Sequence, residues 1–334
     1  MKKIFLFVLG TAAIISSLSG CGSNSPTPPP TPSGWSYTNL HPTDYSYSVA
    51  GAVSSGGWIG GAAFKPTQKE YVSQPIIWKT PLAASATNIY DNKQIPAGIF
   101  AISNSMTGGF LANFGAYWPT STADFPGMVP LESSALSVIY GLSNGWAVGS
   151  ATELGTNPHT YPRLWDLTNS TKTDLTPASE AEARVWGIDG ATASDPGFQV
   201  GEVSPSLHAA LWKGTAGSFV DLHPAMVSGA PSLASAAWAV SGSQQGGYAT
   251  TADDDHAALW SGKASSFVDL HPLKVTGVKN SYIRAMATGI QVGNILFSDD
   301  PTDSHAFLWY GAANTTLTCT PFYPQNSVTP QPWV

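Results

Sequence analysis

Residues 208–224 of this chain read HAALWKGTAGSFVDLHP, and residues 256–272 repeat them with three differences, 48 residues further along. A third, looser copy begins at His305 with the letters HAFLW. Self-similarity at a period of 20–50 residues is typical of folds built from stacked or radially arranged units. The repeat therefore predicts a ring or stack of similar small units, and it suggests that most recurring side chains serve packing.

Six such units can be counted by the tryptophan that closes the HAxLW segment. It recurs at intervals of 40 to 49 residues, at Trp78, Trp118, Trp165, Trp212, Trp260 and Trp309. Each unit contains a bulky-residue segment, a segment with a glycine-aromatic pair, the tryptophan segment and a short segment ending near proline. These runs are rich in aromatic and β-branched residues and are separated by turn residues, which is typical of strands.

Four short strands in a repeat of about 47 residues are typical of a propeller blade. We therefore predict an all-β fold, a six-bladed β-propeller, over residues 35–325, with residues 326–334 as a C-terminal tail. Residues 35–42 (WSYTNLHP) match only the last strand of a unit, so we expect this N-terminal strand to close the ring. The C-terminal unit has its own version of that strand, and the sequence leaves open which of the two lies outermost.

The HAFLW segment at residues 305–309 resembles the bacterial extracellular repeat family named for His-Ala-Phe, the HAF repeat. The units at His208 and His256 match with Ala in place of Phe, whereas the units of Trp78 and Trp118 lack the histidine. The resemblance spans roughly residues 35–325. It implies export and blade-like repeats, and it implies no particular activity.

The first 20 residues have the features of a bacterial export signal. Lys2 and Lys3 precede an apolar stretch at residues 4–15, which is too short to span a bilayer as a mature helix. The following Leu18-Ser19-Gly20-Cys21 resembles the lipobox of bacterial lipoproteins, which implies cleavage before Cys21 and acylation of its side chain and amino group. The alternative is an ordinary secretory signal with an incidental cysteine.

Residues 21–34 (CGSNSPTPPPTPSG) then form an expected tether, because a proline run favours extended polyproline II structure. An anchor of two or more acyl chains is effectively stable in a membrane. We therefore expect a monomer attached to the bacterial cell envelope by its lipid. Gly22 is not an acidic retention signal, which favours the outer membrane if the source has one.

Composition limits the partners that this chain could have. The formal net charge is −7, and it becomes −9 once Lys2 and Lys3 leave with the signal, so nucleic acid is not an expected partner. Besides Cys21 the chain contains only Cys319, so the fold has no disulfide framework.

Six of the seven histidines recur at repeating positions, and only His159 lies outside the pattern. Equivalent residues in separate blades diverge about an axis, so we expect no metal site and no cofactor. Instead, the Asp221/His223 and Asp269/His271 pairs are expected to bond the turn backbone beside proline.

Two other motifs invite a chemical interpretation. Residues 141–145 (GLSNG) match the G-x-S-x-G nucleophile elbow, but that motif requires a strand-to-helix turn, whereas this segment is expected to be a hairpin. The acidic loops at residues 253–255 and 298–303 could bind Ca²⁺, although neither has an EF-hand spacing and a solvated loop is preferred.

Arg184 and Arg284, two of only three arginines, are the candidate ligand-binding residues. We place them two residues before the bulky position of units four and six. If the bulky strand is innermost, both guanidiniums could face the central channel and recognise an anion, unless a nearby acid pairs with them. Six tryptophans are assigned to the core, while Trp58, Trp146, Trp186 and Trp238 could be core or exposed.

These observations favour a noncatalytic binding or scaffold module for a protein or glycan partner. No nucleophile–base pair or paired carboxylate stands out in the sequence. One alternative is an envelope enzyme that acts on polysaccharide, a lyase or glycosidase with its site at the channel mouth. The other is a docking subunit of an outer-membrane assembly complex.

Overall fold

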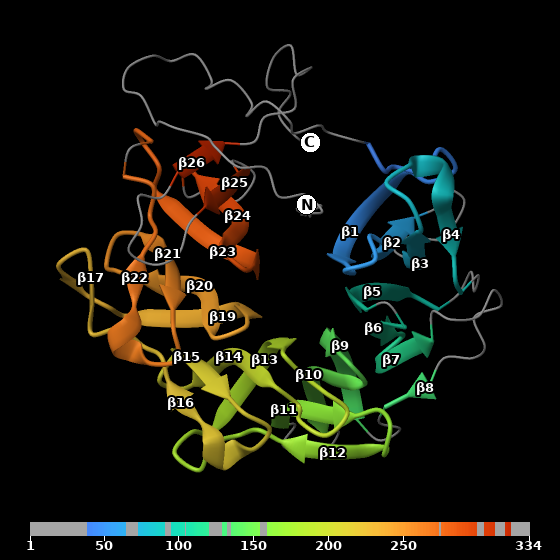
Figure 1. Ribbon diagram of the computed structural model, residues 1–334, viewed down its shortest axis with the longest axis horizontal. Coiled ribbons are helices and arrows are strands. Elements are labelled where there is room, and N and C mark those ends of the chain that lie inside the picture. The colour runs from blue at the N-terminus through green and yellow to red at the C-terminus, as the bar shows by residue number, and fades with distance from the viewer. Residues whose placement is uncertain are drawn as a thin grey trace.

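The computed structural model describes residues 39–64, 73–90, 95–103, 105–119, 129–131, 135–153, 159–273, 275–298, 304–310 and 318–321. Six four-stranded antiparallel sheets are arranged around a common axis, so the protein is a six-bladed β-propeller, as the repeat predicts (Figure 1). The strands of blades 1 to 3 are β1 (Tyr47–Val53), β2 (Ile59–Phe64), β3 (Ser73–Trp78), β4 (Ala86–Asn88), β5 (Ala97–Ile102), β6 (Met106–Leu111), β7 (Phe114–Pro119), β8 (Val129–Pro130), β9 (Ala135–Ser143), β10 (Trp146–Glu153), β11 (His159–Asp166) and β12 (Thr171–Asp174).

The strands of blades 4 to 6 are β13 (Glu182–Asp189), β14 (Phe198–Ser204), β15 (His208–Trp212), β16 (Val220–Asp221), β19 (Ala234–Ser241), β20 (Gln244–Thr250), β21 (Asp255–Trp260), β22 (Val268–Asp269), β23 (Asn280–Ala287), β24 (Ile290–Leu296), β25 (Ser304–Tyr310) and β26 (Thr318–Pro321). Within each blade the chain order is the spatial order, and the bulky-residue strand is innermost (Figure 1). A small hairpin of β17 (Met226–Val227) and β18 (Ala230–Pro231) connects blades 4 and 5.

The core lies between blades and is built around the repeating tryptophans. All six are at most 2% exposed, which confirms their assignment to the core. Trp212 of β15, for example, packs in one cluster with Leu164 of β11 and Val185 of β13. Five of the six tryptophans in this way help to hold one blade against another, because their large apolar surfaces leave water only when both blades are in place. Trp78 packs instead within blade 1 and against Leu40 of the N-terminal segment.

Histidine, aspartate and serine side chains join blades 4 and 5. The Nδ1 atom of His208 lies 2.8 Å from one carboxylate oxygen of Asp221, and the other oxygen accepts the backbone N–H of His223 at 2.8 Å. The Nδ1 atom of His223 lies 2.9 Å from the Oγ atom of Ser235, on the first strand of the next blade. That same Oγ accepts the backbone N–H of Ala209 at 2.9 Å.

The same arrangement recurs between blades 5 and 6. His256 contacts Asp269 at 2.8 Å, and His271 contacts Ser281 at 2.9 Å. We call this contact between the histidine of a DLHP segment and the next blade's serine the His–Ser clamp. The expectation that the aspartates bond turn backbone is confirmed, and the histidines additionally connect neighbouring blades.

The N-terminal segment makes a third clamp, with blade 1. The Nδ1 atom of His41 lies 3.0 Å from the Oγ of Ser48, and the indole N–H of Trp78 donates to the Leu40 carbonyl at 2.9 Å. The latter bond matches the 2.8 Å bond from Trp309 to the Leu270 carbonyl between blades 5 and 6. The described part of the N-terminal segment therefore contacts blade 1 in the same way that the end of an outermost strand contacts the next blade.

The outermost position of blade 6 belongs to the C-terminal strand, because β26 pairs with β25. Residues 35–38 lie outside the described residues, so the expected ring closure by an N-terminal strand remains a prediction. In the part of the chain that the structure describes, no helix is long and apolar enough to cross a membrane.

The GLSNG segment forms the expected hairpin between β9 and β10. Asn144 and Gly145 both adopt positive φ angles, 43° and 85°, and Ser143 pairs with Trp146 across the turn. Two successive left-handed residues match the right-handed twist of the flanking strands. The segment is therefore a strand–turn–strand connection, which lacks the strand-to-helix turn of a nucleophile elbow.

Candidate functional site

Every innermost strand carries one residue that has no partner on the neighbouring strand. The pairing register shifts once in each blade, and the skipped residues are Gly51, Phe100, Tyr140, Trp186, Trp238 and Arg284. A β-bulge of this kind re-aims a side chain that would otherwise follow the alternation of the strand. We call these six equivalent positions the bulge row, and they lie on the strands that surround the propeller axis (Figure 1).

A glycine on the second strand of each blade makes the bulge possible. A Cβ atom added at any of these glycines would lie only 1.8–2.0 Å from a carbonyl oxygen of the innermost strand: Gly61, Gly109, Gly149, Gly201, Gly247 and Gly293. Such a distance is far inside van der Waals contact, so the bulged backbone requires glycine at this position.

The structure corrects the register of the glycine-aromatic pair. Gly109-Phe110 and Gly247-Tyr248 are bulge glycines followed by aromatic residues. The other three pairs that the sequence pattern grouped with them lie at turns, where their glycines have φ angles of 66° to 85°: Gly57-Trp58, Gly145-Trp146 and Gly197-Phe198. The grouping was wrong because turn glycines and bulge glycines both precede aromatic residues.

The position expected for Arg284 on its strand was also wrong by two residues. Arg184 lies two residues before the bulge residue Trp186, as expected, whereas Arg284 is itself the bulge residue of blade 6. Tyr282 is the residue equivalent to Arg184. The two arginines therefore have different environments, although both lie on innermost strands as expected.

Aromatic side chains of the bulge row contact one another across blades 2 to 4. The ring centroids of Phe100 and Tyr140 are 6.1 Å apart, and those of Tyr140 and Trp186 are 4.8 Å apart. Phe100 is 43% exposed, and Tyr140 and Trp186 are half-buried. Aromatic rings with one accessible side offer a flat apolar surface to a ligand.

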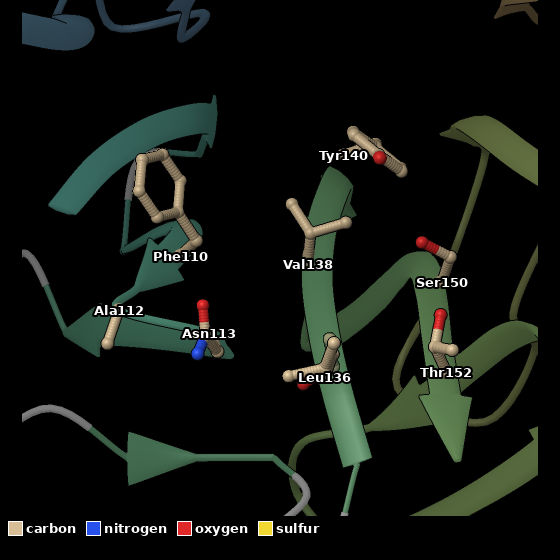
Figure 2. Close-up of a pocket in the computed structure, with 9 residues that line it drawn as sticks. Phe110, Ala112, Asn113, Leu136, Val138, Tyr140, Ser150 and Thr152 are labelled. Carbon is tan, nitrogen blue, oxygen red and sulfur yellow. The ribbon is translucent and has the colours of Figure 1, made fainter. Parts of the chain in front are cut away.

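A hollow of about 310 Å³ adjoins this aromatic group between blades 2 and 3 (Figure 2). The innermost strand β9 contributes Leu136, Val138 and Tyr140 to its wall, and β10 contributes Ser150 and Thr152. Figure 2 shows Phe110 facing this wall from the neighbouring blade. The hollow is wide open to solvent and combines apolar side chains with hydroxyl groups.

The bulge-row residues Trp238 and Arg284 belong to a second cluster of side chains, which lies where blades 5 and 6 meet. The Arg284 guanidinium carbon lies 3.9 Å from the ring centroid of Trp238 and 5.0 Å from that of Tyr282. Its Nε donates to the Asn294 side-chain oxygen at 3.0 Å. Tyr248 completes the cluster, with centroids 4.7 Å from Trp238 and 5.5 Å from Tyr282. We call these residues the Arg284 cluster.

Burial changes the acid–base properties of this cluster. It lowers the pKa of Arg284 to about 10, against the opposing effects of Tyr282, Tyr248 and Asp255. Burial, with the charges of Glu202 and Asp255, raises the pKa of Tyr248 to about 12. Burial and the hydrogen bond to Asp255 also raise the pKa of Tyr282. At neutral pH the cluster therefore contains one cation and two neutral phenols.

Arg184, in contrast, is held by a local acid. Its Nη1 lies 3.3 Å from the carboxylate of Glu202 on β14, and its side chain is 57% exposed. This is the local pairing that the sequence left open as the alternative to a ligand site. The third arginine, Arg163, is nearly buried and lies between Glu153 at 3.6 Å and Asp174 at 3.5 Å, so it is structural.

Where the structure describes them, the remaining sequence candidates do not converge on a second site. Asp255 accepts hydrogen bonds from Thr250 and Tyr282, both at 2.6 Å, while residues 299–303 of the other acidic loop lie outside the described residues, as does Cys21. Among the residues that the structure describes, no three His, Cys, Asp or Glu side chains are grouped as metal ligands would be. The bulge row itself was missed by sequence reasoning, because its members range from glycine to tryptophan.

Comparison with known proteins assigns no family to this chain. No family model matches the chain, and no curated protein matches it in sequence. Its structure is similar to TolB from Acinetobacter baumannii, with a TM-score of 0.42, 11% identity, and coverage of 67% of this chain and 54% of TolB. It is also similar to an acylaminoacyl peptidase from Pyrococcus horikoshii, with a TM-score of 0.46 and 11% identity over 79% of this chain and 43% of the peptidase.

A puromycin-hydrolyzing peptidase from Mycobacterium tuberculosis gives a TM-score of 0.46 and 9% identity over 81% of this chain and 44% of its own length. The chain therefore spans about half the length of the solved structures that it matches. At these identities and TM-scores the likeness concerns the propeller fold and carries no argument about activity.

Proposed function

We propose that this chain is a lipid-anchored binding module of the bacterial cell envelope, which binds its partner along the bulge row and catalyses no reaction. The observation that carries the proposal is the bulge row itself. Four of its six positions are aromatic and a fifth is arginine, although the sheet pairing places no demand on these side chains. Arginine and aromatic residues are enriched where proteins contact their partners.

The histidines and aspartates of the repeats support a binding role in another way. His208, His223, His256 and His271 each bond an aspartate or a serine in the interblade contacts. The groups that would most readily act as general bases are thus engaged in holding blades together. The lipid anchor and envelope location rest on the leader, whose Leu18-Ser19-Gly20-Cys21 segment resembles a lipobox.

A fluorescence titration of the full chain in detergent micelles tests the proposal. Envelope oligosaccharides and peptides are added while tryptophan emission is recorded, and a binding ligand should change the emission saturably. Trp186→Ala and Trp238→Ala should each weaken binding about tenfold or more, because each removes a ring from the contact surface. Trp146→Phe is the matched control, since Trp146 is half-buried at the turn end of the β9–β10 hairpin, outside the bulge row.

Two results would count against the proposal. If both bulge-row variants bind every ligand as tightly as the unmodified chain, the bulge row is not the binding surface. If the chain shortens or cleaves an oligosaccharide during the titration, as product analysis by mass spectrometry would detect, the protein is an enzyme.

A further inference from the structure

We propose that the Arg284 cluster recognises a carboxylate on a ring-shaped ligand, such as the uronic acid units of an acidic saccharide. This inference rests on the proposed function, because it assigns a ligand class to one end of the bulge row. Arg284 would bind the carboxylate, and the neighbouring aromatic rings would contact the flat face of the sugar ring.

The first argument is that the charge of Arg284 has no ion-pair partner among the residues that the structure describes. Among the described residues no carboxylate lies within ion-pair distance of its guanidinium, whereas Arg184 lies 3.3 Å from Glu202. The carboxylate of Asp255 does influence Arg284, but it already accepts hydrogen bonds from Thr250 and Tyr282. A partly buried cation without a counter-charge is costly, which makes an added carboxylate favourable.

The second argument is the way in which Arg284 is held. Trp238 and Tyr282 contact the guanidinium as cation–π partners, and Asn294 binds only its Nε atom. The described residues provide no hydrogen-bond acceptor for the two terminal nitrogens, and neither nitrogen is completely buried. A planar guanidinium fixed in this manner presents two parallel donors, which match the two oxygens of a carboxylate.

The third argument concerns the shape and charge of the surroundings. The aromatic side chains of the bulge row extend over the innermost strands of blades 2 to 5, so the surface suits an extended ligand. The chain as a whole is acidic, with a net charge of −7. An acidic polymer would therefore be attracted at Arg284 and repelled by most of the remaining surface, which fixes its position along the bulge row.

The test compares an oligogalacturonate with its methyl ester, which has the same rings but no negative charge. Both are titrated into the full chain in neutral detergent micelles at low salt, with binding followed by tryptophan fluorescence. We expect the acid to bind about tenfold or more tightly than the ester, as a charge-assisted bidentate contact requires. We also expect this preference to shrink as salt is added.

Two variants of the cluster test the role of Arg284. Arg284→Gln removes the charge and should make acid and ester bind equally. Asn294→Asp is nearly isosteric and places a carboxylate beside the Nε of Arg284, so it should abolish the preference without removing any ring. Arg184→Gln is the control and should keep the preference, because that guanidinium is already paired with Glu202.

Two further results would contradict the inference about the Arg284 cluster. If the unmodified chain binds acid and ester equally, or binds neither, the inference is wrong. If both cluster variants fold, as judged by an unchanged unfolding midpoint, and still prefer the acid, the carboxylate binds elsewhere and the inference is again wrong. The proposed function fails separately, when Trp186→Ala and Trp238→Ala leave the binding of every ligand unchanged.

Discussion

The imidazole rings of His208 and His223 stack face to face, with centroids 3.9 Å apart and planes inclined by 1°. His256 and His271 stack in the same way at the next blade junction, with centroids 4.2 Å apart. Each stack is fixed by an aspartate that bonds one ring and the backbone N–H of the other histidine. Two imidazoles in such contact can be neutral together, but two imidazolium ions would repel each other.

The stability of the propeller should therefore depend on pH. Burial and the neighbouring His208 lower the pKa of His223 below its usual value of 6.5, although Asp221 opposes them. Burial and His256 lower the pKa of His271 in the same way, against Asp269 and Asp254. The folded state thus prefers neutral rings, so this stability is complete above pH 6.5 and declines as the pH falls from there toward the folded-state pKa values.

Urea unfolding at a series of pH values between about 7.5 and 5 checks this expectation. The free energy of unfolding should decrease toward low pH, and a His223→Gln/His271→Gln double variant should show a flatter dependence. His159→Gln is the control, because His159 lies outside the clamps. An unchanged slope in the double variant would show that other groups govern the acid sensitivity.

Removing the serine of a His–Ser clamp should destabilise the blade junction. Ser281 is fully buried, and its hydroxyl oxygen accepts the Ala257 N–H at 2.8 Å while contacting His271. Ser281→Ala leaves a buried donor without an acceptor and should lower the free energy of unfolding by about 1–3 kcal/mol. Ser137→Ala should cost less, because among the described residues the Ser137 hydroxyl bonds only the Gly115 N–H. Equal losses would argue against any contribution from the histidine.

Asp221 and Asp269, which bond the stacked histidines, should contribute differently to the stability of the propeller. The Asp269 side chain is 21% exposed and also accepts a hydrogen bond from Ser228, whereas the Asp221 side chain is 47% exposed. Burial would raise the pKa of Asp269, but hydrogen bonds from His256, Ser228 and the His271 backbone outweigh it and lower the pKa. Its contribution to stability is thus present above its usual value of 3.8 and is lost as the pH falls below it.

At neutral pH we expect Asp269→Asn to lower the free energy of unfolding by about 2 kcal/mol, because it weakens charge-assisted hydrogen bonds. Asp221→Asn should cost clearly less. Chemical denaturation of the two variants under the same conditions gives the comparison, and the reverse ranking would contradict the importance assigned to burial and to Ser228.

The bulge glycines should tolerate no side chain. In Gly201→Ala the new methyl carbon would lie 1.8 Å from the Arg184 carbonyl oxygen, so the strand pair must separate. We expect a loss of at least about 3 kcal/mol, or failure to fold. Gly217→Ala, where no atom lies within 4 Å of the added carbon, should be nearly neutral in a thermal unfolding assay. A small effect of Gly201→Ala would mean that the bulge can relax at little cost.

The proposed lipid anchor predicts a specific consequence of Cys21→Ser. The unmodified chain should incorporate labelled palmitate and sediment with membranes, because acyl chains supply about 0.8 kcal/mol per buried methylene. Cys21→Ser should lose the label and leave the membrane fraction. Cys319→Ser is the matched control and should behave as the unmodified chain does. If the unmodified chain takes up no label, the leader is an ordinary secretory signal, and if the Cys21→Ser protein keeps the label, the acyl chains are attached elsewhere.

The fold could be predicted from the sequence because its packing residues repeat. The closing tryptophans mark the blades, and the turn residues between apolar runs mark the strands, so blade number and strand order both follow. The clamp could be predicted only in part. Serine stands at Ser48, Ser235 and Ser281, after segments that end in histidine, and alanine stands at Ala97 and Ala183, after units that end without it. Serine also stands at Ser137, after a unit that ends without histidine, so a serine at this position does not by itself indicate a clamp.

The candidate site could be predicted only in part. A bulge inserts one unpaired residue, so it moves every later side chain of the strand to the opposite face. Because the bulge residue of blade 6 is arginine, aligning the units by their bulky residue placed Met286 at that position and Arg284 two residues too early. The ion pair of Arg184 likewise depends on Glu202, which is 18 residues away and becomes its neighbour only through the pairing of β13 with β14.

The one-per-blade bulge has a consequence for how such a protein can diversify. Gly51 and Trp238 occupy equivalent positions, so residues at both extremes of side-chain size stand at this position in one chain, each opposite a bulge glycine. Blade 1 is restricted to glycine there, because a Cβ atom added at Gly51 would lie 2.6 Å from the Ile99 carbonyl oxygen, whereas the other five blades carry large side chains at the bulge. Repeat duplication supplies further copies of this position, so the side chains around the axis can differ from blade to blade on one scaffold.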